Sequence, residues 1–203
     1  RAIIAKDYTV DNVARVSIAV SLWLKDKYND PCVVIGHDCR FGGEMFAETV
    51  SKVLAFHKIK VKLAKGFVST PMVSLGVVKE EANLGIVITA SHNPPNYNGY
   101  KLKGDFGGPL LPENVSQVES LIPLENDIDV NSLKKDLLSI LKKTDLMENQ
   151  RKHGFKIVGD NGCNLVSEKI IKTNLEISIL SDENSWINAY IPDFIINVKN
   201  INN

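Results

Sequence analysis

The residues best suited to chemistry lie in the run Thr89-Ala90-Ser91-His92-Asn93-Pro94, which is continued by Asn98-Gly99-Tyr100-Lys101. The Ser91 hydroxyl is a candidate nucleophile, because serine oxygens can hold a transferred group covalently. The histidine beside it can exchange protons near neutral pH, and the lysine supplies a cation whose proton affinity responds to its surroundings. Most neighbouring serine and histidine residues are ordinary loop surface, so this pair acquires meaning only from its context.

One familiar serine chemistry is not expected here. The G-x-S-x-G elbow of the α/β-hydrolases is absent around Ser91. Residues adjacent in sequence also seldom place an imidazole correctly for the neighbouring hydroxyl. A serine protease or esterase is therefore not the function that this run predicts.

The position of the run agrees with a ligand site. It directly follows Leu84–Ile88, a continuous apolar segment typical of a strand buried on both faces of a sheet. Open parallel sheets bind ligands beyond the carboxyl ends of their strands. Residues 89–98, which we call the serine loop, are therefore expected at the ligand-binding edge of a sheet.

The elements that position this loop alternate between strands and helices, which predicts an α/β fold with parallel pairing and right-handed crossovers. Helical periodicity or capping residues predict the following helices: Thr9 to Tyr28, Glu44 to Phe56, Pro71 to Val78, Pro112 to Ile122 and Val130 to Asp145. Apolar runs predict the following strands: Cys32–Ile35, Val61–Ala64 and Leu84–Ile88, with a short extended piece at Tyr100–Lys103.

A change in composition suggests two domains. Residues 1–150 are expected to form a first domain that carries the serine loop and ends in an interdomain helix. The polar segment from Met147 to Gly154 then leads into a predicted strand, Phe155–Val158. Residues 151–203 are expected to form an incomplete second α/β domain, with a strand, helix, strand order over residues 155–180.

The composition argues against several partners and settings. Twenty-four basic residues balance 24 acidic ones among 203, so neither nucleic acid nor an anionic membrane is an expected partner. Three cysteines without paired spacing indicate a reducing compartment, and no apolar run is long enough for a membrane span. A soluble, cytoplasmic protein is expected, and its oligomeric state is left open.

The whole run from Thr89 to Lys101 resembles the phosphoserine signature of the α-D-phosphohexomutases, which include the bacterial phosphoglucomutases and phosphomannomutases. Arg1 is similar to the arginine that ends this family's N-terminal glycine-rich segment. The segment Gly36-His37-Asp38-Cys39-Arg40 resembles the family's G-x-D-x-R loop. The resemblance covers about residues 1 to 122, and it implies a mixed, mainly parallel sheet sandwiched by helices.

The resemblance implies an enzyme that interconverts hexose 1-phosphate and hexose 6-phosphate through a phosphoserine and a hexose 1,6-bisphosphate, which also serves as activator. Ser91 would carry the phosphoryl group, and its phosphate would help to bind one Mg²⁺ ion. Phosphoryl transfer depends mainly on positioning, charge neutralisation and control of one proton. The residues implied in catalysis are Ser91, His92, Lys101 and Arg1. The residues implied in supporting the loop or the substrate are Asn93, Asn98, Asp38 and Arg40, where an ion pair between Asp38 and Arg40 is the expected brace.

The chain departs from the family pattern after the first domain. The D-x-D-x-D-R loop that supplies the other Mg²⁺ ligands is absent, and Asp127-Ile128-Asp129 is the only D-x-D sequence. The chain is therefore expected to be an N-terminal part of such an enzyme, inactive alone, with its choice among glucose, mannose and glucosamine phosphates left open. The alternative is a non-catalytic module that retains the fold and binds a sugar phosphate or a protein.

Overall fold

The computed structural model describes residues 1–133, 139–141, 146, 155–157, 165–167, 175–180 and 195–200, with side chains for residues 1–133 and 146. Its centre is a five-stranded sheet in the order β6-β4-β2-β3-β7. Parallel pairing joins β2 to β3 and β4, and β3 to β7, whereas β6 runs antiparallel to β4. The expected mixed, mainly parallel sheet is thus confirmed. The strands are β2 (Cys32–His37), β3 (Lys60–Ala64), β4 (Leu84–Ile88), β6 (Tyr100–Gly104) and β7 (Ser139–Leu141).

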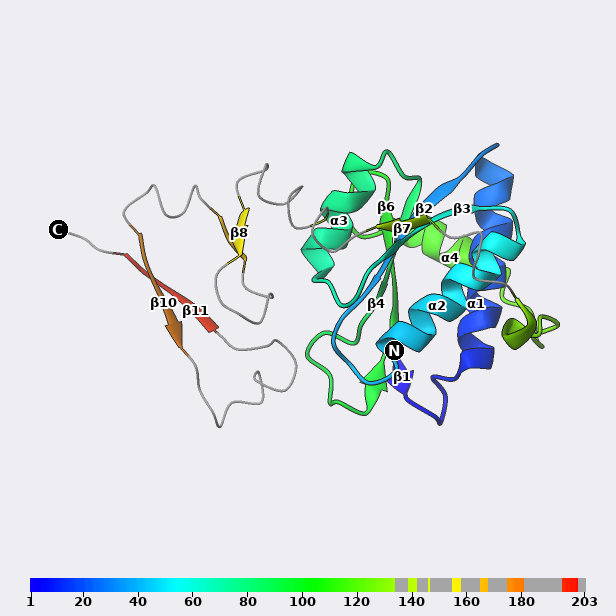
Figure 1. Ribbon diagram of the computed structural model, residues 1–203, viewed down its shortest axis with the longest axis horizontal. Coiled ribbons are helices and arrows are strands. Elements are labelled where there is room, and N and C mark those ends of the chain that lie inside the picture. The colour runs from blue at the N-terminus through cyan, green and yellow to red at the C-terminus, as the bar shows by residue number, and fades with distance from the viewer. Residues whose placement is uncertain are drawn as a thin grey trace.

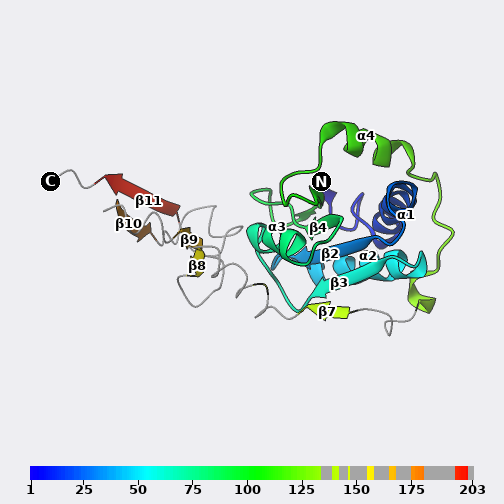
Figure 2. The same ribbon diagram turned by 90° about the horizontal axis from the view of Figure 1, so that it is seen from above.

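Helices cover both faces of the sheet, with α3 on one side and α1 and α2 on the other (Figure 1). Val33 and Ile35 of β2 pack with α1, α2 and α4, whereas Val34 between them packs with α3. Alternate residues of a strand point to opposite faces, so a sheet covered on both sides requires the continuous apolar run seen in the sequence. The helices are α1 (Val10–Lys27), α2 (Gly43–Phe56), α3 (Thr70–Lys79) and α4 (Pro112–Ser120), with α4 lying beside α1 (Figure 2).

The helices begin where the local sequence permits. The Thr9 side chain accepts a hydrogen bond from the main-chain N–H of Asn12, 3.2 Å away, and so caps α1. Gly42 adopts φ +72° immediately before α2, a conformation that costs glycine little. Pro71 and Pro112 lie in the first turns of α3 and α4, where a missing N–H is harmless.

A two-residue ribbon ties the N-terminus to the serine loop. In this ribbon β1 (Ala2–Ile3) pairs antiparallel with β5 (Tyr97–Asn98), so that Ala2 lies opposite Asn98. Arg1 is thereby brought next to a loop that is distant in sequence.

The prediction of a helix over Val130–Asp145 is wrong for part of that range. Val130–Ser132 forms only a short 3₁₀ helix, η1, in which the Asp129 carboxylate accepts a hydrogen bond from the N–H of Asn131. Ser139–Leu141 is the strand β7, because the open edge of β3 offers backbone partners that outweigh helical periodicity. Tertiary pairing of this kind commonly overrides propensity.

The C-terminal predictions are met only in part. The strands β8 (Phe155–Ile157) and β10 (Leu175–Leu180) fall where strands are expected, but Leu165–Ser167 forms the strand β9 within the interval assigned to a helix. Antiparallel pairing joins β8 to β9, and β10 to β11 (Ile195–Asn200). The boundary segment from Met147 to Gly154 and Cys163 lie outside the described residues.

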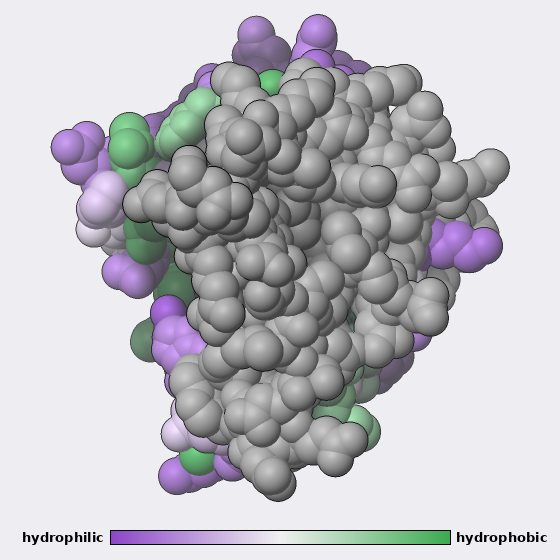
Figure 3. All heavy atoms as spheres, turned by 90° about the vertical axis from the view of Figure 1, so that its left-hand side faces the viewer, coloured by the Kyte–Doolittle hydropathy of each residue, from purple (hydrophilic) through white to green (hydrophobic). Residues whose placement is uncertain are grey.

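Within the described residues, no helix is long and apolar enough to cross a membrane. Where these residues are visible in Figure 3, hydrophilic side chains and smaller hydrophobic groups are interspersed.

Candidate active site

The serine loop leaves the end of β4 with a strained residue. Ser91 has φ +55°, in the left-handed region that residues with a side chain rarely adopt. The Ser91 N–H donates to the Thr89 hydroxyl oxygen at 3.0 Å, and the Asn93 N–H donates to the Ala90 carbonyl at 3.0 Å. Such a conformation persists only where surrounding contacts enforce it, which often occurs at functional sites.

The main enforcing contact is the guanidinium group of Arg40. Its Nη2 donates to the carbonyl oxygens of Ser91 at 2.5 Å and Asn93 at 2.7 Å, and its Nη1 donates to those of Pro94 at 2.8 Å and Tyr97 at 3.1 Å. The Arg40 side chain is only 5% exposed. A planar, permanently charged fork is well suited to hold several carbonyl groups at fixed positions. Arg40 thus lies at the centre of the serine loop.

Asp38 joins its own loop to the serine loop. One carboxylate oxygen accepts from the Arg40 N–H at 3.0 Å; the other accepts from the Thr89 hydroxyl at 2.5 Å and lies 3.4 Å from Arg40 Nε. The expected ion pair is therefore present. Thr89 links the two loops, since its hydroxyl group donates to the Asp38 carboxylate while its oxygen accepts from the Ser91 N–H. The sequence alone does not distinguish Thr89 from any other threonine at a strand end.

Arg1 reaches the same loop from the N-terminus. Its Nη1 donates to the Asn93 side-chain oxygen at 3.1 Å. A Cβ atom on Gly99 would lie 2.7 Å from the Thr89 carbonyl oxygen and 3.1 Å from Arg1 Cγ, so only glycine fits there. Asn98 is fully buried; its side-chain oxygen accepts from the Gly99 N–H at 2.9 Å, and its amide nitrogen lies 3.5 Å from the Phe41 carbonyl oxygen. These contacts fix the segment that leads into β6.

Lys101 lies on β6 opposite Val87 of β4. Burial lowers the pKa of the half-buried Lys101 ammonium, and the charges of Arg1, Lys103 and Arg40 lower it further, against an opposing effect from Asp38. A lysine in this state releases its proton more readily than an exposed one. His92, the residue after Ser91, is exposed, and its side chain makes no hydrogen bond to the part of the chain that the structure describes.

The side chains described, those of residues 1–133 and 146, form no group of three His, Cys, Asp or Glu residues able to hold a metal ion. The Asp127-Ile128-Asp129 sequence does not supply one, because the Asp129 carboxylate caps η1. The described residues therefore do not fit a Mg²⁺ site, beyond the single oxygen that a phosphate on Ser91 could offer.

Known proteins share this architecture. Residues 1–127 match the family model of phosphoglucomutase/phosphomannomutase, alpha/beta/alpha domain I. The chain is 37% identical over 124 residues to a phosphoglucomutase of Staphylococcus haemolyticus. The aligned region covers 59% of this chain and 23% of that protein.

Two solved structures are also similar. A protein described as a phosphomannomutase from Thermus thermophilus shares 36% identity at a TM-score of 0.65, covering 70% of this chain and 31% of that one. The open form of pp63/parafusin, a phosphoglucomutase from Paramecium, shares the fold alone, at 16% identity and a TM-score of 0.56 over 73% of this chain and 32% of that one. The chain thus spans less than a third of the length of each of these proteins. From the match over residues 1–127, the chain belongs to the phosphoglucomutase/phosphomannomutase family and contains its α/β/α domain I.

Proposed function

We propose that this chain provides the phosphoserine domain of an enzyme that interconverts hexose 1-phosphate and hexose 6-phosphate. The observation that carries the proposal is the serine loop, in which Ser91 is held at φ +55° by contacts from Arg40, Asp38 and Thr89. A nucleophile on a rigid, preformed loop at the end of a parallel strand is what in-line group transfer requires.

In the proposed reaction, the bond between phosphorus and Ser91 Oγ breaks while a hydroxyl oxygen of the bound hexose phosphate forms a new bond to phosphorus. The hydroxyl proton leaves as that bond forms, and Ser91 Oγ gains a proton. The resulting hexose 1,6-bisphosphate turns over and returns its other phosphoryl group to Ser91. Atoms balance over the cycle, because the enzyme ends as it began, with Ser91 phosphorylated.

Two cationic side chains have defined parts in this proposal. Lys101, whose lowered pKa eases proton exchange, would stabilise or protonate the Ser91 oxygen. Arg1, which donates to Asn93, would bind the phosphoryl oxygens. His92 is exposed beside the nucleophile and free to meet the substrate. Mg²⁺, which the family implies for the complete enzyme, would neutralise charge on the transferring group, but the described residues offer it no carboxylate set.

The test replaces domain I of the S. haemolyticus phosphoglucomutase with residues 1–127 of this chain. The chimera should turn over glucose 1-phosphate with glucose 1,6-bisphosphate as activator, and mass spectrometry should find the phosphate on the Ser91 peptide. Ser91→Ala should remove both signals, and Ser116→Ala, a change at an exposed position of α4, is the matched control. Undiminished turnover in Ser91→Ala would refute the proposal. A module that only binds would bind glucose 6-phosphate without acquiring a phosphate.

A further inference from the structure

The peptide group after the nucleophile has a fixed direction. The Ser91 carbonyl oxygen accepts from Arg40 Nη2 at 2.5 Å, and the Arg40 side chain is only 5% exposed, so this oxygen points into the protein. The peptide bond between Ser91 and His92 is trans, and the C=O and N–H of a planar trans peptide point in opposite directions. The N–H of His92 therefore points outward, on the side of the serine loop away from Arg40.

This outward N–H is not used within the loop. It makes no hydrogen bond to the described part of the chain, and His92 is exposed. The flanking residues differ, because the N–H groups of Ser91 and Asn93 both donate to oxygens of the loop. The next two residues, Pro94 and Pro95, have no N–H. Within this described stretch, residues 91–95, the main-chain donor left for a ligand is that of His92.

The same N–H lies next to the group that would carry a phosphate. The Ser91 side chain is partly exposed, and its hydroxyl makes no hydrogen bond to the residues that the structure describes. Only Cβ, Cα and the carbonyl carbon of Ser91 separate its Oγ from the His92 nitrogen, so a phosphate on Oγ has oxygens within reach of this N–H. The α/β-hydrolases use the equivalent atom, since the N–H after their nucleophilic serine helps to bind an oxyanion. A preformed donor of this kind stabilises negative charge without reorganisation.

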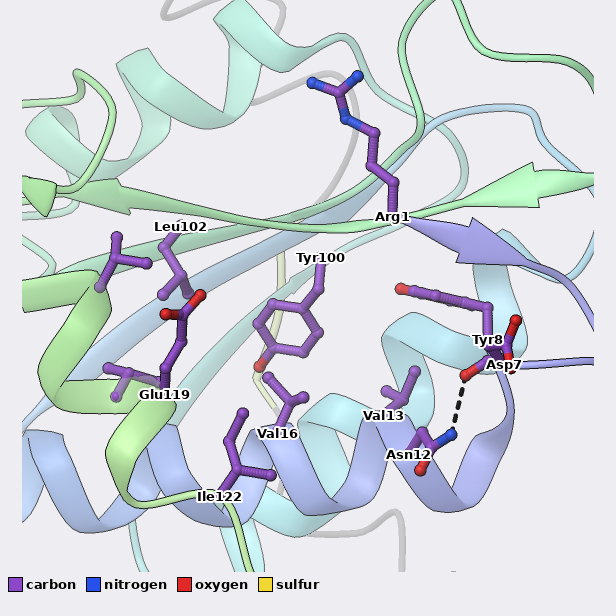
Figure 4. A pocket seen from close by; sticks show the side chains of 12 residues that line it. Arg1, Asp7, Tyr8, Asn12, Val13, Val16, Tyr100, Leu102, Glu119 and Ile122 are labelled. Carbon is purple, nitrogen blue, oxygen red and sulfur yellow. Dashed lines mark hydrogen bonds between the residues drawn. The ribbon is translucent and has the colours of Figure 1, made fainter.

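The surrounding charge also suits an anion. The Arg1 guanidinium points away from the other labelled side chains in Figure 4 and donates to Asn93 of the serine loop at 3.1 Å. Burial lowers the pKa of Lys101, and the positive charges of three other basic residues, Arg1 among them, lower it further, whereas only Asp38 acts in the opposite direction. Cations that disfavour one another in this way are stabilised by an anion placed beside them.

We propose that the main-chain N–H of His92, oriented by Arg40 through the Ser91 carbonyl, donates a hydrogen bond to an oxygen of the phosphoryl group that Ser91 carries. This inference rests on the proposed function, because it takes Ser91 as the phosphoryl carrier. It gives the main chain of His92 a role separate from that of its imidazole. Arg40 is then a positioning residue, since it acts on the phosphate only through the peptide group that it orients.

The experiment uses the full 203-residue chain with phosphoserine encoded in place of Ser91, so it requires no turnover. Amide NMR without divalent cations should show the His92 amide proton moved downfield from its place in the unmodified chain. The His92 amide nitrogen should also show a scalar coupling to phosphorus across the hydrogen bond. His92→Ala keeps the N–H and should retain both signals, whereas Arg40→Ala releases the Ser91 carbonyl and should lose the coupling.

The matched control encodes phosphoserine in place of Ser116, at an exposed position of α4. The amide that follows it, that of Gln117, lies within the hydrogen-bonded helix and should show neither signal. The proposal fails if the His92 amide responds no more than the Gln117 amide does in this control. It also fails if His92→Ala abolishes the response, since the imidazole would then be the group that binds the phosphate.

Two further outcomes separate the parts of the argument. A coupling that survives in Arg40→Ala would refute the orientation by Arg40. A domain I chimera that turns over, together with no coupling in the phosphoserine chain, would reject this inference and leave the proposed function in place. A coupling in the phosphoserine chain, together with a chimera that does not turn over, would do the reverse.

Discussion

Replacing Arg40 with alanine should disorder the serine loop more than it disturbs the sheet. The side chain makes four hydrogen bonds to loop carbonyls and an ion pair with Asp38. A hydrogen bond from a charged donor contributes about 1.5–3 kcal/mol when fully buried. Because the loop is only partly buried, we take about 1 kcal/mol for each, and Arg40→Ala should lower the free energy of unfolding by about 4 kcal/mol.

Arg40→Ala should also change the conformation of the serine loop itself. Without the guanidinium group, little opposes the strain of Ser91 at φ +55°, which is of the order of 1–3 kcal/mol. The loop should therefore relax, and the backbone amide signals of Ser91 and His92 should move or broaden while those of β2 and α1 stay in place. Arg40→Lys should recover only part of the lost stability, since a single ammonium group cannot reproduce the planar fork.

The assay combines urea unfolding followed by circular dichroism with amide NMR of the folded chain. Arg15→Ala is the matched control, because Arg15 also donates to a carbonyl, that of Pro123 at 2.8 Å, and to Asn12, but lies away from the serine loop. This control should cost about 1–2 kcal/mol and leave the Ser91 amide unmoved. Wild-type stability in Arg40→Ala, or a Ser91 amide that responds equally to both changes, would refute the reasoning.

Three further predictions concern other parts of the chain. Lys101→Met should stabilise the chain near neutral pH, because the pKa of Lys101 is lower in the folded chain than in the unfolded chain, which therefore binds the proton more tightly. The stability of the wild type should then rise with pH up to about 10.4. Thermal melts from pH 7 to 10 should show the difference in stability between the variant and the wild type becoming smaller. A difference independent of pH would contradict this. Gly99→Ala should cost about 1–3 kcal/mol in urea unfolding, because its Cβ would clash with the Thr89 carbonyl, whereas Gly66→Ala meets no atom within 4 Å and should cost only the roughly 1 kcal/mol of its positive φ. The 203-residue chain alone should show no mutase turnover in a coupled assay with Mg²⁺ and glucose 1,6-bisphosphate, since it spans about a quarter of the curated relative; turnover of about 1–1,000 s⁻¹ would overturn that expectation.

The sequence predicts the sheet well because local signals and tertiary packing agree there. Thr9 caps α1 where expected, and the apolar run Leu84–Ile88 is a central strand buried on both faces. The strand Ser139–Leu141 could not be found in the same way, because its apolar spacing suits a helix and only the open edge of β3 decides its pairing. Periodicity records which residues are apolar, but not which backbone edge is available.

In the candidate site too, contacts within one loop could be predicted from the sequence, whereas contacts between distant segments could not. The pairing of Asp38 with Arg40 is readable from their spacing, since two residues on one short loop can reach each other. The contacts of Arg40 with Ser91 and Tyr97 join loops that are distant in sequence, and no local pattern encodes them. The outward direction of the His92 N–H is likewise invisible in sequence, because it depends on the hydrogen bond from Arg40 to the Ser91 carbonyl.

The short ribbon formed by β1 and β5 has a consequence for the order of folding. Pairing of Ala2 with Asn98 closes a long loop of chain for only two residues of ladder, so it should form after the parallel strands between them. The same pairing should open first, as a subglobal unfolding event that releases Arg1 and Tyr97 while the sheet persists. Native-state hydrogen exchange should then find β1 and β5 protected far less than β2 and β4, and the competence of Ser91 should be lost at temperatures where the domain is still folded.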